Sequence, residues 1–278
     1  MTALVNVLVT IGMLVVVPAG LRLLGDPAAG LARRLWPYGA VAGAISLWLP
    51  RGPVATALAT VYAVAAAVLC AYAIGRPIRP RREWAAEAAV LTALVSPAIA
   101  ASALIAERSG YHLFGFKLGI LALTVAHFHF AGFAAALIAG LQTRVAPGRA
   151  ADLAALTVPA GTLLVLLGYF TAEAVELAGA LVLTAGMWTV GWLIWRYART
   201  AAPDRLTAVL LGGSAAVLAV SMVLAVSWAL GEATGLPHPS LAWMAATHGV
   251  ANALGFAVCG MVGWRRAGVG LGQLERTS

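Results

Sequence analysis

The chain has 278 residues, of which 62% are hydrophobic and only 10% are charged, and its mean hydropathy is +0.92. A soluble domain is closer to half apolar and a quarter charged, so this composition excludes an ordinary soluble protein. The net charge of +8 does not indicate a nucleic-acid partner, because the basic residues lie in short connections between apolar runs. Long apolar runs predict an all-α, polytopic transmembrane helix bundle, since a spanning β-barrel would show short alternating segments.

Nine apolar segments are predicted to span the membrane, within a single integral membrane domain formed by residues 1–278. They cover residues 3–21, 35–50, 53–75, 84–106, 116–141, 153–170, 174–195, 206–231 and 241–264. A helix needs roughly 20 apolar residues to cross the hydrocarbon core of a bilayer, and the second of these segments is shorter than that. The first segment has no basic residue before it and is long enough to be retained, so no cleavable signal peptide is expected.

The distribution of basic residues predicts the orientation of these segments. The connections after the odd-numbered segments, together with the C-terminal tail, hold 15 of the 18 basic residues. Only Arg51, Arg108 and Lys117 fall on the opposite side. Because Lys and Arg are enriched in cytoplasmic loops, we expect the N-terminus outside and the C-terminus in the cytoplasm. The expected location is the cell (plasma or inner) membrane.

The fifth segment carries two histidines near its middle, where a polar ring is costly unless it finds a partner. On a helix, residues two apart point in directions about 200° apart, so His127 and His129 cannot bind one metal ion together. We expect at least one of them to line a catalytic site, and Phe128 between them to contact the substrate. The alternative is that both histidines are buried structural donors.

The ninth segment contains THGVANALGF, residues 247–256, in which His248 and Asn252 share one helix face. In the predicted topology the fifth and ninth segments run in the same direction. The helical rise then places His127 and His248 at similar depth. These residues predict a site in the outer half of the membrane, and the alternative is an Asn/His hydrogen bond that holds the bundle together.

Two carboxylates lie at the outer end of the seventh segment. Glu173 and Glu176 are three residues apart and share a face, so a desolvated carboxyl there could act as a general acid. The alternative is a solvated helix N-terminus, where carboxylates favour the helix dipole. Further substrate contacts are expected from residues near the outer surface: Tyr111, His112, Tyr169, Trp228 and Trp243.

Two stretches of the sequence resemble known proteins. The motifs TVAHFHFAGF (124–133) and THGVANALGF (247–256), in that order, resemble the YndJ-like family of bacterial membrane proteins over roughly residues 84–266. The resemblance implies membership in a family without a settled function. It therefore points to His127, His129, His248 and Asn252 without giving their roles.

Separately, VAHFHF (125–130) is similar to the haem-ligating helix of haem–copper oxidases. Such a site needs six histidines, including an adjacent pair, whereas this chain has five histidines and no His-His pair. A terminal oxidase is therefore excluded. A simpler haem b held by His127 and His248 stays open.

These residues predict an intramembrane enzyme that performs acid–base chemistry, such as cyclisation, isomerisation or dehydration, on a lipophilic small molecule. His127 or His129 would be the general base or acid, Glu173 or Glu176 the proton donor, and Asn252 an orienting amide. This prediction needs no cofactor and no metal, and its partners are the substrate and membrane lipid, with the oligomeric state left open. The alternatives are a haem- or metal-binding redox protein and a small-molecule transporter, although no internal repeat indicates a transporter. No nucleophile elbow, phosphate loop or zinc motif occurs in the sequence.

Overall fold

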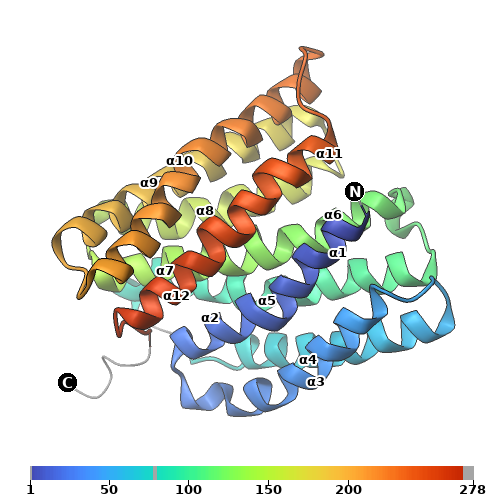
Figure 1. Ribbon diagram of the computed structural model, residues 1–278, viewed down its shortest axis with the longest axis horizontal. Helices are drawn as coiled ribbons and strands as arrows, with labels where there is room; N and C mark the ends of the chain where they lie inside the picture. Colours follow the sequence, from blue (N-terminus) through green and yellow to red (C-terminus); the bar gives the residue numbers. More distant parts are fainter. Residues whose placement is uncertain (1, 78–79, 272–278) are drawn as a thin grey trace. The chain divides into compact units, whose positions relative to one another are not determined.

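The computed structural model describes residues 2–77 and 80–271, and the regular secondary structure of that part of the chain is entirely helical (Figure 1). This confirms the all-α class. Arg79 and Arg276, two of the basic residues counted for the orientation, lie outside the described residues.

Eight helices within the described residues are long and apolar enough to cross a membrane. They are Thr2–Leu24, Pro53–Ile74, Trp84–Ser109, Leu118–Val145, Arg149–Gly168, Glu173–Thr200, Arg205–Thr234 and Leu241–Arg266. Each coincides with one of the nine predicted segments. The remaining prediction, residues 35–50, falls on α3 (Gly30–Ser46), which has 17 residues and lies at the lower limit of what spans a bilayer.

The chain divides into two compact units, which are described separately. The first unit comprises the described residues within Met1–Ile78, Leu91–Ala134 and Leu271–Ser278. The second comprises those within Arg79–Val90 and Ala135–Gly270.

The first unit is built on helices from the N-terminal half of the chain. Their bounds are α1 (Thr2–Ile11), η1 (Gly12–Val16), α2 (Val17–Leu24), α3 (Gly30–Ser46), α4 (Pro53–Ile74), most of α5 (Trp84–Ser109), α6 (Leu118–His127) and most of η5 (Phe128–Ala135). A short turn makes α3 and α4 an antiparallel pair, and they approach closely at glycines. A Cβ atom on Gly43 would lie 2.9 Å from Cβ of Tyr62, so glycine is what allows the backbone of α3 to reach that tyrosine.

The second unit is an up-and-down bundle with short connections. Its elements are α7 (Ala136–Val145), α8 (Arg149–Gly168), α9 (Glu173–Thr200), α10 (Arg205–Thr234), α11 (Leu241–Met244), η6 (Ala245–Gly249), η7 (Ala251–Val258) and α12 (Cys259–Arg266). α8 and α9 meet along a glycine seam: Gly161 and Gly168 on α8, and Gly179 and Gly186 on α9, face the partner backbone or side chains. Each pair is spaced by seven residues, or two helical turns, so the small residues repeat along one face of each helix.

Four segments within the described residues are π-helical, namely η1, η5, η6 and η7, and the last three coincide with the sequence motifs. η5 overlaps the first motif, and η6 with η7 covers nearly all of the second. π-helical geometry is rare and is found frequently at functional sites, because the wider turn releases a backbone carbonyl from the regular ladder. The two motifs therefore share an uncommon backbone as well as histidines.

Candidate functional site

His129 is completely buried in the first unit, and both of its ring nitrogens are occupied. Nδ1 lies 2.7 Å from the carbonyl oxygen of Val125, so this nitrogen carries the proton and donates it. Nε2 is then the acceptor, and the hydroxyl of Tyr62 donates to it over 2.9 Å. Gly12 of η1 lies directly against the ring, where a Cβ atom would come within 2.7 Å of Cβ of His129. His129 thus has no nitrogen left for a ligand unless one of these bonds breaks.

The other first-unit residues predicted for the site lie in different surroundings. His127 ends α6, is half-buried, and packs edge-on against the ring of Phe128, with centroids 5.9 Å apart. Phe128 itself is buried. Tyr111 and His112 lie in the connection between α5 and α6 and are both exposed.

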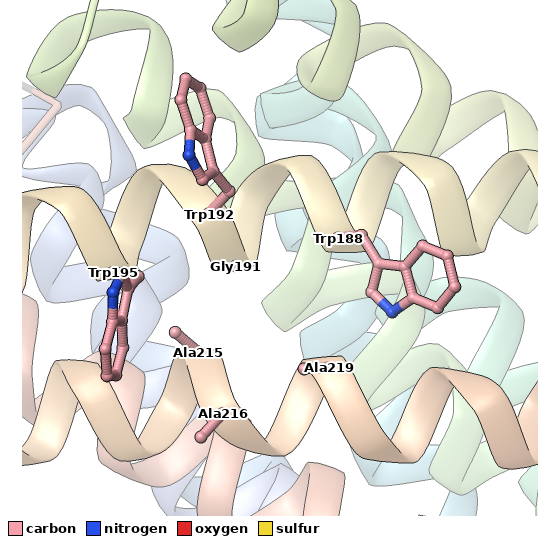
Figure 2. Close-up of a pocket in the computed structure, with 7 residues that line it drawn as sticks. All are labelled: Trp188, Gly191, Trp192, Trp195, Ala215, Ala216 and Ala219. Carbon is pink, nitrogen blue, oxygen red and sulfur yellow. The ribbon is translucent and has the colours of Figure 1, made fainter.

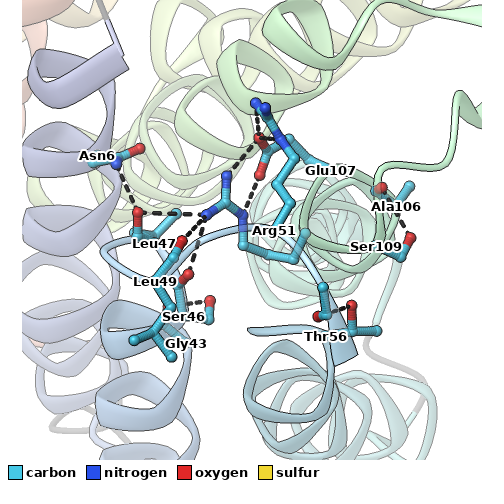
Figure 3. A network of polar contacts seen from close by, with 12 residues as sticks. Asn6, Gly43, Ser46, Leu47, Leu49, Arg51, Thr56, Ala106, Glu107 and Ser109 are labelled. Atoms are coloured by element: carbon cyan, nitrogen blue, oxygen red, sulfur yellow. Dashed lines mark hydrogen bonds and ion pairs between the residues drawn. The ribbon is translucent and has the colours of Figure 1, made fainter. Parts of the chain in front are cut away.

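A charged network at the end of α5 is a polar feature of the first unit that the sequence did not predict (Figure 3). Glu107 and Arg108 are only 2% and 4% exposed and bond to each other. Arg51 adds two hydrogen bonds to the same Glu107 oxygen, at 2.7 and 2.9 Å. Arg108 also donates to backbone carbonyls at the C-terminal end of α3, including that of Ser46 at 3.1 Å. The network therefore satisfies the unpaired carbonyls of a helix end with a buried cation.

In the second unit, His248 is held by α10 and by its own helix. Nδ1 lies 2.8 Å from the carbonyl oxygen of Ser221, so this nitrogen carries a proton and donates it. The side-chain amide of Asn252 donates to the backbone carbonyl of His248 over 2.9 Å, and its nitrogen lies 3.2 Å from Nδ1 and 3.3 Å from Nε2. The Oδ1 atom of Asn252 accepts from the hydroxyl of Ser221 over 3.0 Å. The amide nitrogen is thus nearly equidistant from the two ring nitrogens, so it does not lie along the Nε2 lone pair of the neutral, half-buried ring.

A second polar group lies at the C-terminal end of α10. Glu232 forms an ion pair with His238 over 3.1 Å, and the rings of Trp228 and His238 meet edge-on. Tyr169 follows the end of α8, is 40% exposed, and lies within electrostatic reach of Glu176 and Glu232. Of the other predicted residues, Glu173 and Trp243 are exposed and Glu176 is half-buried.

The two polar groups of the second unit lie along one face of α10. Ser221 and Glu232 are 11 residues apart, close to three full turns, so their side chains leave the helix in nearly the same direction about 16 Å apart along the axis. Trp228 lies between them on that face. Three predicted residues therefore lie at or between these two polar groups. His248 and Asn252 belong to the group at Ser221, and Trp228 lies between that group and the group at Glu232. Among the described residues, no group of three or more His, Cys, Asp or Glu side chains could hold a metal ion.

Sequence reasoning missed the partners that fix these histidines. Tyr62 and Ser221 are single polar residues inside long apolar runs, and a hydroxyl there is a usable signal, since a buried hydroxyl needs a partner. The sequence also gave no expectation that Glu107 and Arg108 would be buried. The signal for their burial is an adjacent pair of opposite charges at the end of an apolar helix.

Comparison with known proteins gives a family and no detailed relative. No curated protein and no solved structure matches the chain. The family model described as "YndJ-like protein" matches residues 7–256, which is nearly the whole chain and includes both π-helical motifs. The protein therefore belongs to the YndJ-like family.

Proposed function

We propose that this protein is an intramembrane enzyme that performs acid–base chemistry on a lipophilic small molecule, with His248 as the proton acceptor. The observation that carries the proposal is the anchoring of His248. Its Nδ1–H is committed to the carbonyl of Ser221, which leaves Nε2 as the basic atom. A base held in one tautomer and one orientation by a second group is the arrangement that general-base catalysis needs.

The neighbouring residues take supporting roles in this proposal. Asn252 holds its amide nitrogen against the imidazole of His248, and its Oδ1 atom accepts a hydrogen bond from the hydroxyl of Ser221. Glu176 and the Glu232–His238 pair lie towards the other end of the same unit, where they can exchange protons with water. We assign His129 a positioning role, because both of its nitrogens have internal partners. His127, at the end of α6, is the proposed second reactive histidine.

The reaction class follows from these groups. A neutral imidazole, an amide and carboxyl groups can move protons, so cyclisation, isomerisation or dehydration of a lipid-soluble substrate is within their reach. The apolar composition of the helices supports a substrate that arrives through the bilayer. We further propose a location in the cell (plasma or inner) membrane with the N-terminus outside, which the bias in the basic residues supports.

The experiment compares lipid extracts of cells that produce the wild-type protein, His248→Gln or Arg34→Gln, by liquid chromatography with mass spectrometry. The wild type should change the abundance or retention time of at least one lipid-soluble compound. His248→Gln should abolish that change, while Arg34→Gln, at an exposed position outside the proposed site, should retain it. Unfolding temperatures must match between variants. A lipid profile that is the same for the wild type, His248→Gln and an empty vector would contradict the proposal.

One observation also favours a haem-binding redox protein as a second candidate. Histidine ligands of metals typically donate their other ring N–H to a carbonyl or carboxylate, as Nδ1 of His248 does. Nε2 of His248 would be the ligating atom. A Soret band in the natively purified wild type that is lost in His248→Gln is the expected result for this candidate. A colourless but active preparation would eliminate it.

A further inference from the structure

The second unit carries an open groove between α9 and α10 (Figure 2). It has a volume of about 430 Å³ and is lined by Trp188, Gly191, Trp192, Trp195, Ala215, Ala216 and Ala219. The three tryptophans come from α9, whereas α10 supplies only alanines. Large rings on one helix thus stand beside a row of methyl groups on the next, and this difference in size makes the hollow.

The tryptophans are spaced so that one face of α9 carries all of them. Trp188, Trp192 and Trp195 recur at intervals of four and three residues and extend about 10 Å along the helix axis. They are 47%, 50% and 46% exposed. Trp195 reaches across to α10, where a Cβ atom on Gly212 would lie 3.7 Å from its ring. The groove is therefore an aromatic and apolar surface that the rest of the second unit leaves open.

One end of this groove is strongly basic. Arg196 lies over the ring of Trp192, with its guanidinium carbon 4.9 Å from the ring centroid. Arg199 continues the tryptophan face one turn beyond Trp195, and Arg205 begins α10 beside it. All three arginines are exposed, and none has an ion pair within the part of the chain that the structure describes.

The carboxylate nearest in sequence is already occupied. Asp204 accepts hydrogen bonds from the backbone and hydroxyl of Thr207, and it forms an ion pair with Arg266 over 3.3 Å. It therefore does not neutralise the arginines at the end of the groove. An apolar groove that ends in uncompensated positive charge is complementary to a molecule with a hydrocarbon chain and an anionic head.

We propose that this groove is a binding site for one anionic phospholipid. An acyl chain lies along Trp188, Trp195 and the alanines of α10, and the phosphate meets Arg196 and Arg199. Basic sites beside transmembrane helices bind anionic headgroups in this way. Each arginine increases the affinity by about tenfold or less.

The charge also argues against a second copy of the chain as the occupant. A symmetric, parallel pairing of two grooves would bring the arginines of both copies to the same end, where like charges repel. The phosphate of an anionic lipid has the opposite charge and is attracted to the same arginines. The site is independent of the proposed catalytic group around His248, because it depends on other residues of α9 and α10.

The test is native mass spectrometry of the purified full-length protein, titrated with phosphatidylglycerol or with phosphatidylcholine. The wild type should retain one phosphatidylglycerol and show no retained phosphatidylcholine. The double variant Arg196→Gln/Arg199→Gln should bind phosphatidylglycerol at least about tenfold more weakly. Its matched control, Arg33→Gln/Arg34→Gln, removes two arginines from the first unit and should leave binding unchanged.

A second pair of variants tests the groove without changing charge. Ala219→Phe fills the hollow from an exposed position and should also weaken retention of phosphatidylglycerol. Val220→Phe, at the next residue and not part of the lining, should have no effect. Equal retention of both lipids by the wild type, unchanged binding in both test variants, or a wild-type dimer that Ala219→Phe converts to a monomer would each overturn the proposal.

Discussion

The hydroxyl of Tyr62 on α4 donates a 2.9 Å hydrogen bond to Nε2 of His129 in η5, and the two rings stack with their centroids 6.0 Å apart. The same tyrosine ring meets Trp36 of α3 edge-on. Three helices of the first unit are thus joined through one buried histidine whose tautomer is set by Val125. This arrangement makes His129 a residue whose partners can be tested one at a time.

Replacing Tyr62 with Phe should destabilise the protein by about 1–2 kcal/mol. The ring and its packing remain, but Nε2 of His129 loses its donor in a site that water does not reach. Thermal unfolding of the purified protein in detergent measures the change. Tyr38→Phe is the matched control, because Tyr38 is 74% exposed and should show no effect. Equal unfolding temperatures for the two variants would contradict the hydrogen bond.

Gly12→Ala should destabilise the protein by about 1–3 kcal/mol, because the new methyl group would overlap the His129 side chain. Alanine favours a helix over glycine by close to 1 kcal/mol, so the clash must exceed that gain. Gly30→Ala is the control, since no atom lies within 4 Å of a Cβ there. The control should be neutral or slightly stabilising. A stabilised Gly12→Ala variant would show that His129 does not pack against η1.

Arg108→Gln should cost about 3–5 kcal/mol, because it leaves buried Glu107 with a single cation and removes the donor to the end of α3. Arg51→Gln should cost less than about 1 kcal/mol, since the Arg51 side chain is 46% exposed and its pair with Glu107 is screened by solvent. Both variants lose one positive charge, so the difference between their free energies of unfolding reports the effect of burying the arginine. Chemical or thermal unfolding should therefore rank them clearly, and a reversed order would refute the structural role of Arg108.

The Asp204 carboxylate should make the stability of α10 depend on pH in acid. Hydrogen bonds from the backbone and hydroxyl of Thr207, with a smaller effect of Arg266, hold the pKa of Asp204 below its usual range. A carboxyl whose pKa is lowered by folding stabilises the folded state above the unfolded pKa of about 3.9, and loses that contribution as the pH falls through the folded pKa. The difference in unfolding temperature between the wild type and Asp204→Ala should be constant from about pH 7 to about pH 5. It should then shrink below about pH 4.

If that difference stays constant down to about pH 3, Asp204 does not cap α10 as a carboxylate. Asp204→Asn separates two parts of the effect. It keeps a good N-cap residue but removes the charge that faces Arg266, so it should unfold between the wild type and Asp204→Ala at neutral pH.

Much of the fold could be predicted from the sequence, because the membrane imposes a single strong constraint. A backbone in hydrocarbon must satisfy its own hydrogen bonds, so long apolar runs mean helices, and eight of the nine predicted segments are membrane-length helices. The family could also be predicted, since two short motifs with histidines carry the resemblance. The short second segment, residues 35–50, falls on α3, a helix that begins at Gly30 and contains Pro37 in its interior.

The partners of the candidate site residues were decided by tertiary structure alone. Nothing in the spacing of His127 and His129 says that Tyr62, 67 residues before His129, occupies its Nε2. Likewise, only the packing of α10 against the last helix brings Ser221 to His248 and Asn252. Local sequence determines which segments become helices, whereas the faces that meet depend on glycines and side-chain sizes that act across distant segments. Arg51 and Arg108, which counted only as exceptions to the charge bias, share one buried carboxylate for the same reason.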